Sequence, residues 1–226
     1  MSVLDELVAG ALQDQRTREQ AMPLDAVKQA AAAAPAPLDA RRWLRHADAV
    51  PIIAEIKRAS PSKGHLADIP DPAALAAEYE RGGAAAISVL TEGRRFLGSL
   101  DDLDRVRAAV HIPVLRKDFI TTPYQIWEAR AHGADIVLLI VAALDDATLR
   151  ELLDLTHELG MTALVETHTA EEIERAVQAG AAVIGINARN LKDLSVNVGN
   201  YRELGAALPP DVIKVAESGV FGPVEL

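Results

Sequence analysis

The sequence predicts an α/β fold of the TIM (β/α)8-barrel type, and three observations lead to this prediction. From about residue 50 onward, short apolar runs alternate with segments of helical spacing. The runs are nearly continuous, as strands of a parallel sheet are when helices cover it. Successive runs start about 21 to 33 residues apart, the length of one strand–helix unit, and no residue pattern recurs within that interval as it would in a solenoid.

Seven apolar runs are the predicted strands, and helical segments lie between them. Strands are expected at Ile52–Lys57, Ala85–Leu90, Val114–Phe119, Ile136–Val141, Thr162–Thr167, Val183–Ala188 and Val212–Ser218. Helices are expected at Ala73–Arg81, Leu100–Val110, Tyr124–His132, Ala147–Leu159 and Glu171–Ala179. Pro72 and Pro123 suit first turns of helices, and Gly82–Gly83, Gly133, Gly160 and Gly180 suit left-handed helix ends.

Residues 1–50 are predicted to form a helical extension packed on the barrel of residues 51–226. The first twenty residues place an apolar stripe along one side of a helix. An Ala-rich stretch follows at Val27–Ala34, and a short helical piece is expected around Arg41–Arg45. The stripe, Trp43 and Leu44 favour packing over the alternative of a flexible tail.

Polar side chains near the ends of five strands favour a barrel over an open, doubly wound sheet. Because alternate residues of a strand share a face, they lie beside apolar neighbours: Glu55 and Lys57 with Ile53, Lys117 with Leu115, Glu166 with Leu164, Asn187 with Gly185, and Glu217 with Val215. A barrel brings all these ends into one mouth, where its active site lies. An open sheet brings together only those at a switch point.

The composition restricts the class of protein. Half of the residues are hydrophobic, a quarter are charged and the net charge is −10, so the chain has no general attraction to nucleic acid or anionic membrane. No apolar run approaches the ~20 residues that cross a bilayer, and no segment looks like a signal peptide. The absence of cysteine excludes disulfides and fits a reducing compartment. We therefore expect a cytoplasmic protein without a nucleic-acid or membrane partner.

The charged strand ends suit acid–base chemistry on an anionic substrate. A single Lys or Glu there is more often a surface residue or a helix cap. Several of them in one mouth are costly unless they pair and bind a ligand. Lys57 and Lys117 can hold anions or donate protons, and Glu55, Glu166 and Glu217 can accept or relay them.

Further residues add to this interpretation. Asn187 and Arg189 supply hydrogen-bond donors, and Ser218–Gly219 offers half of a phosphate cup. The uncharged fourth strand could form an apolar wall for a flat ring, although most of its residues are expected in the core. The six histidines have no metal-site spacing, and neither GxGxxG nor a Walker loop occurs, so neither a metal nor a cofactor is predicted.

Five strand-end segments, taken in order, resemble the motifs of one known family. They are EIKRASPSKG (55–64), LRKDF (115–119), LVETH (164–168), IGINARNL (184–191) and AESGV (216–220). The family is indole-3-glycerol phosphate synthase of tryptophan biosynthesis, and the resemblance covers essentially the whole chain. The family converts 1-(2-carboxyphenylamino)-1-deoxyribulose 5-phosphate into indole-3-glycerol phosphate, releasing CO2 and water without a cofactor.

The resemblance implies a role for each matching residue. It places five residues in catalysis: Lys117 as the general acid in ring closure, Glu166 as its partner base, Glu55 and Lys57 in the dehydration, and Asn187 in orienting the substrate. It places six more in substrate binding: Ser60, Phe119, Arg189, Glu217, Ser218 and Gly219. Among these, Ser218–Gly219, with Lys57, meets the phosphate, Arg189 lies near the carboxylate, and Phe119 flanks the aromatic ring. The loop Arg58–Pro72 is long enough to act as a lid.

The sequence departs from an eight-stranded barrel at its C-terminal end. After the seventh strand the chain runs FGPVEL to Leu226, so seven of eight strands are predicted, with the first and seventh as unpaired edges. Three explanations stay open: a shortened record of a complete enzyme, complementation by a second chain, or a shortened protein that binds without catalysing. Both a monomer and a pair with a complementing chain agree with the sequence.

Two rival functions remain. Another phosphosugar-barrel enzyme, such as phosphoribosylanthranilate isomerase, would share the phosphate cup but would not need Lys57, Lys117 and Glu166 together. A non-catalytic scaffold would need none of these side chains.

Overall fold

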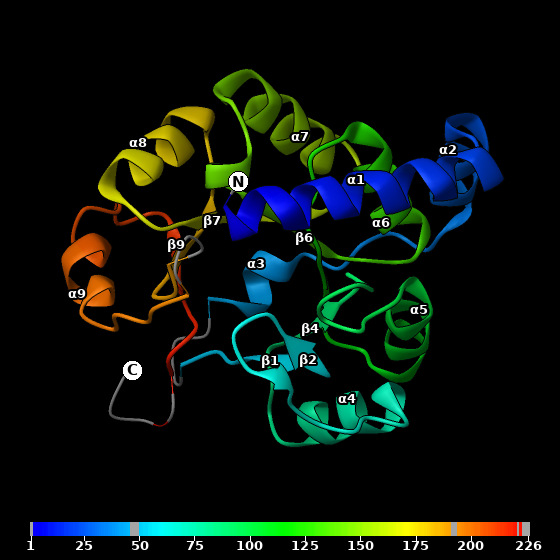
Figure 1. Ribbon diagram of the computed structural model, residues 1–226, viewed down its shortest axis with the longest axis horizontal. Coiled ribbons are helices and arrows are strands. Elements are labelled where there is room, and N and C mark those ends of the chain that lie inside the picture. The colour runs from blue at the N-terminus through cyan, green and yellow to red at the C-terminus, as the bar shows by residue number, and fades with distance from the viewer. Residues whose placement is uncertain (1, 46–49, 191–193, 221, 223–226) are drawn as a thin grey trace.

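The computed structural model describes residues 2–45, 50–190, 194–220 and 222. Its main sheet has seven parallel strands in the order β1-β4-β5-β6-β7-β8-β9, so each strand pairs with the next main-sheet strand along the chain. Figure 1 shows helices placed around the curved sheet and helix α1 running across the molecule. This arrangement confirms the predicted barrel class.

The main-sheet strands lie within the seven predicted runs. Their bounds are β1 Ile53–Ile56, β4 Ala86–Leu90, β5 Val114–Lys117, β6 Ile136–Ile140, β7 Thr162–Thr167, β8 Val183–Asn187 and β9 Ile213–Glu217. β1 and β9 are the two ends of the sheet. The described residues contain no eighth strand of this sheet, and none of the described residues before β1 forms a strand in its place.

The helices between the strands agree closely with the predicted segments. They are α4 Pro72–Arg81, α5 Leu100–Ala109, α6 Pro123–Ala131, α7 Asp146–Glu158 and α8 Ala170–Ala179. Pro72 and Pro123 occupy first turns, where a backbone N–H would have no helical partner. Gly180 ends α8 in the left-handed conformation, with a φ of 89°. No helix in the described part of the chain combines the length and apolar character that a bilayer span requires.

The described N-terminal residues form three helices: α1 Val3–Ala21, α2 Leu24–Ala33 and α3 Ala40–Trp43. A capping box between Ser2 and Asp5 begins α1, because each residue's side chain accepts from the other's backbone N–H. Leu4 and Leu7, on one side of α1, are buried. The predicted apolar stripe therefore packs against the rest of the molecule.

Two apolar cores stabilise the fold. The first lies between the sheet and its surrounding helices, where residues such as Val137 of β6 meet residues such as Leu152 of α7. The second joins the inward-facing strand residues, such as Leu138, to Leu7 of α1 and to Leu44 just after α3. The N-terminal helices thus complete the interior core of the barrel.

The sequence pattern misses three short elements. β2 Ala59–Ser60 and β3 Gly64–His65 form an antiparallel hairpin in the loop after β1, and α9 Asn200–Gly205 precedes β9. The 3-10 turn η1 Val141–Ala143 ends the fourth strand one residue earlier than predicted. Elements this short contain too few residues to display a hydrophobic period.

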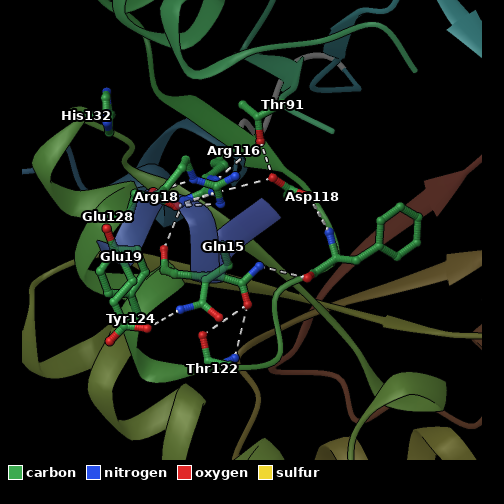
Figure 2. A network of polar contacts seen from close by, with 12 residues as sticks. Gln15, Arg18, Glu19, Thr91, Arg116, Asp118, Thr122, Tyr124, Glu128 and His132 are labelled. Carbon is green, nitrogen blue, oxygen red and sulfur yellow. Dashed lines mark hydrogen bonds and ion pairs between the residues drawn. The ribbon is translucent and has the colours of Figure 1, made fainter. Parts of the chain in front are cut away.

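A fully buried guanidinium, Arg116 of β5, links the sheet to its outer layer of helices. Its Nη2 lies 2.9 Å from Glu128 Oε2 and 3.2 Å from Asp118 Oδ2, and its Nη1 donates to the Gln125 carbonyl at 3.0 Å. Glu128 also accepts from Arg18 of α1, through Nε at 2.6 Å and Nη2 at 3.0 Å. Figure 2 shows this network, which connects α1, α6 and β5.

Candidate active site

A cavity of about 450 Å³ lies at the carboxyl ends of the strands. All seven strands or the residues directly after them contribute to its lining: Ile53, Glu55 and Lys57; Ser88 and Leu90; Leu115 and Lys117; Leu138 and Ile140; Leu164 and Glu166; Asn187; and Val215 and Glu217. The remaining residues predicted for the site also line it: Ser60, Phe119, Arg189, Ser218 and Gly219. A barrel produces this convergence, and an open sheet does not.

Lys117 stands at the centre of the charged groups in the cavity. Its Nζ lies 3.2 Å from Glu55 Oε2 and 3.2 Å from Glu217 Oε2, and the Lys57 ammonium donates to Glu55 Oε1. Burial acts against a charge on Lys117, but the Glu55 and then the Glu217 carboxylates outweigh it, so its pKa is raised. Lys117 is therefore an ammonium at neutral pH.

The three glutamates that line the cavity differ in their affinity for a proton. Burial favours the neutral form of Glu55, but Lys117 and then Lys57 outweigh burial and lower its pKa to about 2. The pKa of Glu166 is also lowered, because a hydrogen bond from His168 and the charge of Lys117 outweigh its burial. Burial and the neighbouring Glu166 carboxylate raise the pKa of Glu217. The cavity thus combines ionised carboxylates with one that retains a proton.

The Glu217 carboxyl group lies directly over Gly185 of β8. A Cβ atom at position 185 would collide with Glu217 Oε1, so only glycine admits this approach. The same oxygen is buried and has no hydrogen-bond partner among the described residues. Buried polar atoms are rarely left unpaired, so this oxygen remains available to a proton or to a ligand in the cavity.

An apolar part of the lining comes from β6 and from aromatic side chains. Leu138 and Ile140 of β6 line the cavity together with Phe96 and Phe119, whose ring centroids are 6.1 Å apart. Leu7 of α1 adds to the same lining. Such a surface suits a flat, apolar ring.

The loop after β1 brings hydroxyl groups and a cation to the cavity. Ser60, Ser62 and Lys63 line it. Arg58 fixes the start of this loop with a bidentate ion pair to Asp102, through Nη1 at 2.6 Å and Nη2 at 2.9 Å. The hairpin β2–β3 therefore begins from a fixed point beside the site.

Two turns after β8 and β9 complete the polar lining. Ser218 and Gly219 both have positive φ values, 67° and 71°, which turn the chain sharply at the end of β9. Asn187 Oδ1 accepts from the backbone N–H of Arg189 at 2.9 Å, and Arg189 Nη1 donates to the Leu194 carbonyl at 3.0 Å. These contacts fix both side chains before a ligand binds.

Comparison with known sequences identifies the family. A family model described as indole-3-glycerol phosphate synthase matches residues 4–226. Curated relatives with that name are 60% identical in Beutenbergia cavernae and 61% identical in Mycolicibacterium vanbaalenii and Rhodococcus opacus. The matches cover 99 to 100% of this chain and 82 to 84% of the relatives. The chain belongs to the indole-3-glycerol phosphate synthase family.

A solved structure gives an independent likeness of fold. N-acetylmannosamine-6-phosphate 2-epimerase from Clostridium perfringens matches with a TM-score of 0.57 and 15% sequence identity, covering 77% of this chain and 78% of that chain. At this identity the likeness shows the fold alone.

All eleven residues that the resemblance to the indole-3-glycerol phosphate synthase family singled out share one cavity. The last residue of the IGINARNL motif, at position 191, lies outside the described residues. Sequence reasoning missed Ser88, Leu90 and Phe96, which carry no charge, and Leu7, which comes from the N-terminal helix. It excluded a metal role for His168 and assigned it no other, although His168 ends the LVETH motif. Within the described residues, no group of three His, Asp or Glu side chains gathers as a metal site requires.

Proposed function

We propose that this cavity carries out the reaction of the indole-3-glycerol phosphate synthase family, the ring closure, decarboxylation and dehydration of 1-(2-carboxyphenylamino)-1-deoxyribulose 5-phosphate. Family membership assigns this carboxy-lyase reaction, and with it a phosphorylated small-molecule substrate, to the chain. The single observation that carries the residue assignment is Lys117, an ammonium between two carboxylates inside a partly apolar cavity. We also propose a cytoplasmic location, as expected for an enzyme of tryptophan biosynthesis.

Lys117 is the general acid of ring closure in this proposal. Attack of the aromatic ring carbon on the ketone places negative charge on the ketone oxygen, and a positioned ammonium stabilises and protonates that oxygen. Loss of CO2 from the attacking ring carbon restores the aromatic ring, and Glu166, ionised in the same wall, is the partner base for the protons that leave when water is eliminated. Glu55 and Lys57, joined by their own hydrogen bond, then assist the dehydration. Asn187 orients the substrate.

The remaining residues bind the two ends of the substrate. Ser218 and Gly219, in their tight turn, meet the phosphate, with Lys57 as a nearby cation and Ser60 in the loop after β1. Arg189 lies near the substrate carboxylate. Phe119, with the β6 wall, flanks the aromatic ring, and Glu217 lies beside Lys117. Closure of the loop Arg58–Pro72 as a lid stays a prediction.

The relatives favour this reaction over that of another phosphosugar barrel, such as phosphoribosylanthranilate isomerase. The fold and the phosphate turn fit both reactions. The cluster of Lys57, Lys117 and Glu166 fits the one that releases CO2.

The test is a fluorescence assay of indole-3-glycerol phosphate formation by the 226-residue chain, combined with measurement of CO2 release. Lys117→Met is expected to lower kcat by roughly 10²–10⁴-fold, the usual contribution of a general acid. Lys28→Met is the matched control, since Lys28 of α2 lies over the Trp127 ring of α6 and is absent from the cavity lining. Turnover that survives Lys117→Met contradicts the assignment. A chain that neither turns over nor binds the substrate contradicts the function.

The same experiment addresses assembly. A native mass measurement on the active sample distinguishes a monomer from a pair with a second chain. Within one chain, we propose that the helices of residues 1–50 and the strands of residues 51–226 act as one unit around the cavity, because Leu7 of α1 is part of its lining.

A further inference from the structure

His168 lies directly after β7, behind the Glu166 carboxylate, and is not among the residues that line the cavity. Its Nε2 is 3.3 Å from Glu166 Oε1, and no other described polar atom pairs with this buried nitrogen. Its Nδ1 is 3.1 Å from Glu172 Oε2 on α8. The imidazole thus joins the proposed base of the reaction to a carboxylate on the outer helix.

The start of α8 fixes the orientation of this ring. Thr169 caps the helix by accepting from the Glu172 N–H at 3.2 Å. Glu172, on the first turn, reaches back and accepts from the His168 backbone N–H at 2.7 Å as well as facing Nδ1. Each ring nitrogen therefore faces a carboxylate, and only the doubly protonated ring offers an N–H to both.

The charges around His168 favour its imidazolium form. Glu166 of β7 and Glu172 of α8 face its two nitrogens, while Lys117 and Glu217 interact with Glu166. Arg175, further along α8, is committed to Asp146 and to two backbone carbonyls. Burial opposes a charge on the ring, but hydrogen bonds to Glu166 and Glu172 outweigh it and raise the pKa of His168 to about 9.

We propose that His168 is a positioning residue for this active site: held from behind by Glu172, its imidazolium keeps Glu166 ionised and in place, so that the proton of the Glu166–Glu217 pair stays on Glu217. The inference rests on the proposed function, because it assigns His168 to the base of that reaction. It identifies a residue that acts on catalysis without touching the substrate.

The test is the pH dependence of kcat for His168→Gln, which keeps a hydrogen-bond donor near Glu166 but removes the charge. Loss of the charge raises the pKa of Glu166, so the acid limb of the profile moves to higher pH. On this limb, kcat is expected to fall roughly tenfold for each pH unit below the new pKa of Glu166, and to return to within about twofold of wild type near pH 9. His132→Gln is the matched control, because His132 forms a similar pair with Asp104 at 2.7 Å on the surface.

Glu172→Gln provides a second, milder variant that retains the contact at the start of α8. It removes one of the two carboxylates that favour the imidazolium, so the acid limb is expected to move in the same direction by a smaller amount. A uniform loss of kcat at every pH in both variants, or unchanged profiles, overturns the inference. If the wild-type chain forms no indole-3-glycerol phosphate, the proposed function fails and the inference needs a separate test. That test is titration of the His168 ring by NMR. An equal pKa of His168 in wild type and in Glu172→Gln overturns the inference.

Discussion

Arg116 and Lys117 are neighbours on β5, and each is a cation held by two carboxylates, yet they face opposite sides of the sheet. The outer cluster around Arg116 is closed: every carboxylate oxygen of Glu128 and Asp118 has at least one partner, in the network that Figure 2 shows. The inner cluster around Lys117 is open, because it adjoins a cavity and leaves Glu217 Oε1 without a partner among the described residues.

This difference separates a structural charge cluster from a functional one. Buried charges are costly unless fully paired, so a closed network can fix the position of helices but has no capacity left for a ligand. The inner cluster retains an unsatisfied oxygen, a carboxyl group that holds a proton and room for a substrate. Burial of charge alone therefore does not mark the site; incomplete pairing beside a cavity does.

The largest expected effect on stability comes from opening the closed cluster. Arg116→Met leaves Asp118 and Glu128 buried with one cation fewer, so the free energy of unfolding is expected to fall by about 3–5 kcal/mol. Lys117→Met is expected to cost less than roughly 2 kcal/mol, because its carboxylate partners reach the cavity and can be hydrated. Urea unfolding of both variants measures the contrast. Equal losses would remove the distinction between the two clusters.

A smaller loss is expected where the closed cluster reaches the N-terminal helix. Arg18→Met removes the bond between α1 and Glu128, but Arg116 still pairs with that carboxylate. Because Arg18 is partly exposed, the expected loss is about 1–2 kcal/mol. Arg16→Met, an exposed neighbour on the same helix, is the control, with an expected change within about 0.5 kcal/mol. A matching effect of the two variants would show that Arg18 contributes as a surface residue only.

The inner cluster could be predicted from the sequence and the outer one could not. Strand alternation and charged residues near the ends of β5, β7 and β9 suffice to place Lys117, Glu166 and Glu217 in one mouth. Arg116 has the same local signal, reversed in face, but its partner Glu128 lies on α6, and the second cation on Glu128 is Arg18 of α1, 110 residues away in the sequence. The hydrophobic pattern of a single strand or helix cannot show that residues so far apart in the sequence will meet.

His168 was missed for a related reason. Its spacing excludes a metal site, but its partner Glu172 lies only four residues ahead, and that pairing depends on a helix beginning at Ala170. The hairpin β2–β3 escaped prediction because two residues per strand show no alternation. The contacts of single residues at the ends of elements can therefore be found only from the structure, whereas strands and helices of full length can be predicted from the sequence.

The smallest expected effect tests the charge states inside the open cluster. The pKa of Glu217 is raised in the folded state, so the protonated carboxyl group stabilises the fold at pH values below its unfolded-state pKa. This stabilisation is lost as the pH rises through the folded-state pKa. Glu217→Gln removes this dependence. The stability of the variant relative to wild type is therefore expected to increase between about pH 5 and pH 8, by on the order of 1 kcal/mol.

Glu55→Gln is the matched control, because the same cluster shifts Glu55 in the opposite direction. With a folded pKa of about 2, Glu55 contributes stability above its unfolded pKa and loses it as pH falls through 2. Glu55→Gln is thus expected to be less stable than wild type at neutral pH, with the deficit shrinking in acid. Urea unfolding, measured from acid pH near the folded pKa of Glu55 up to about pH 8, gives the stability of both variants. The two variants are thus expected to change in opposite directions relative to wild type as pH rises. If both gained stability relative to wild type with rising pH, the cluster would not divide its carboxyl groups into ionised and protonated members.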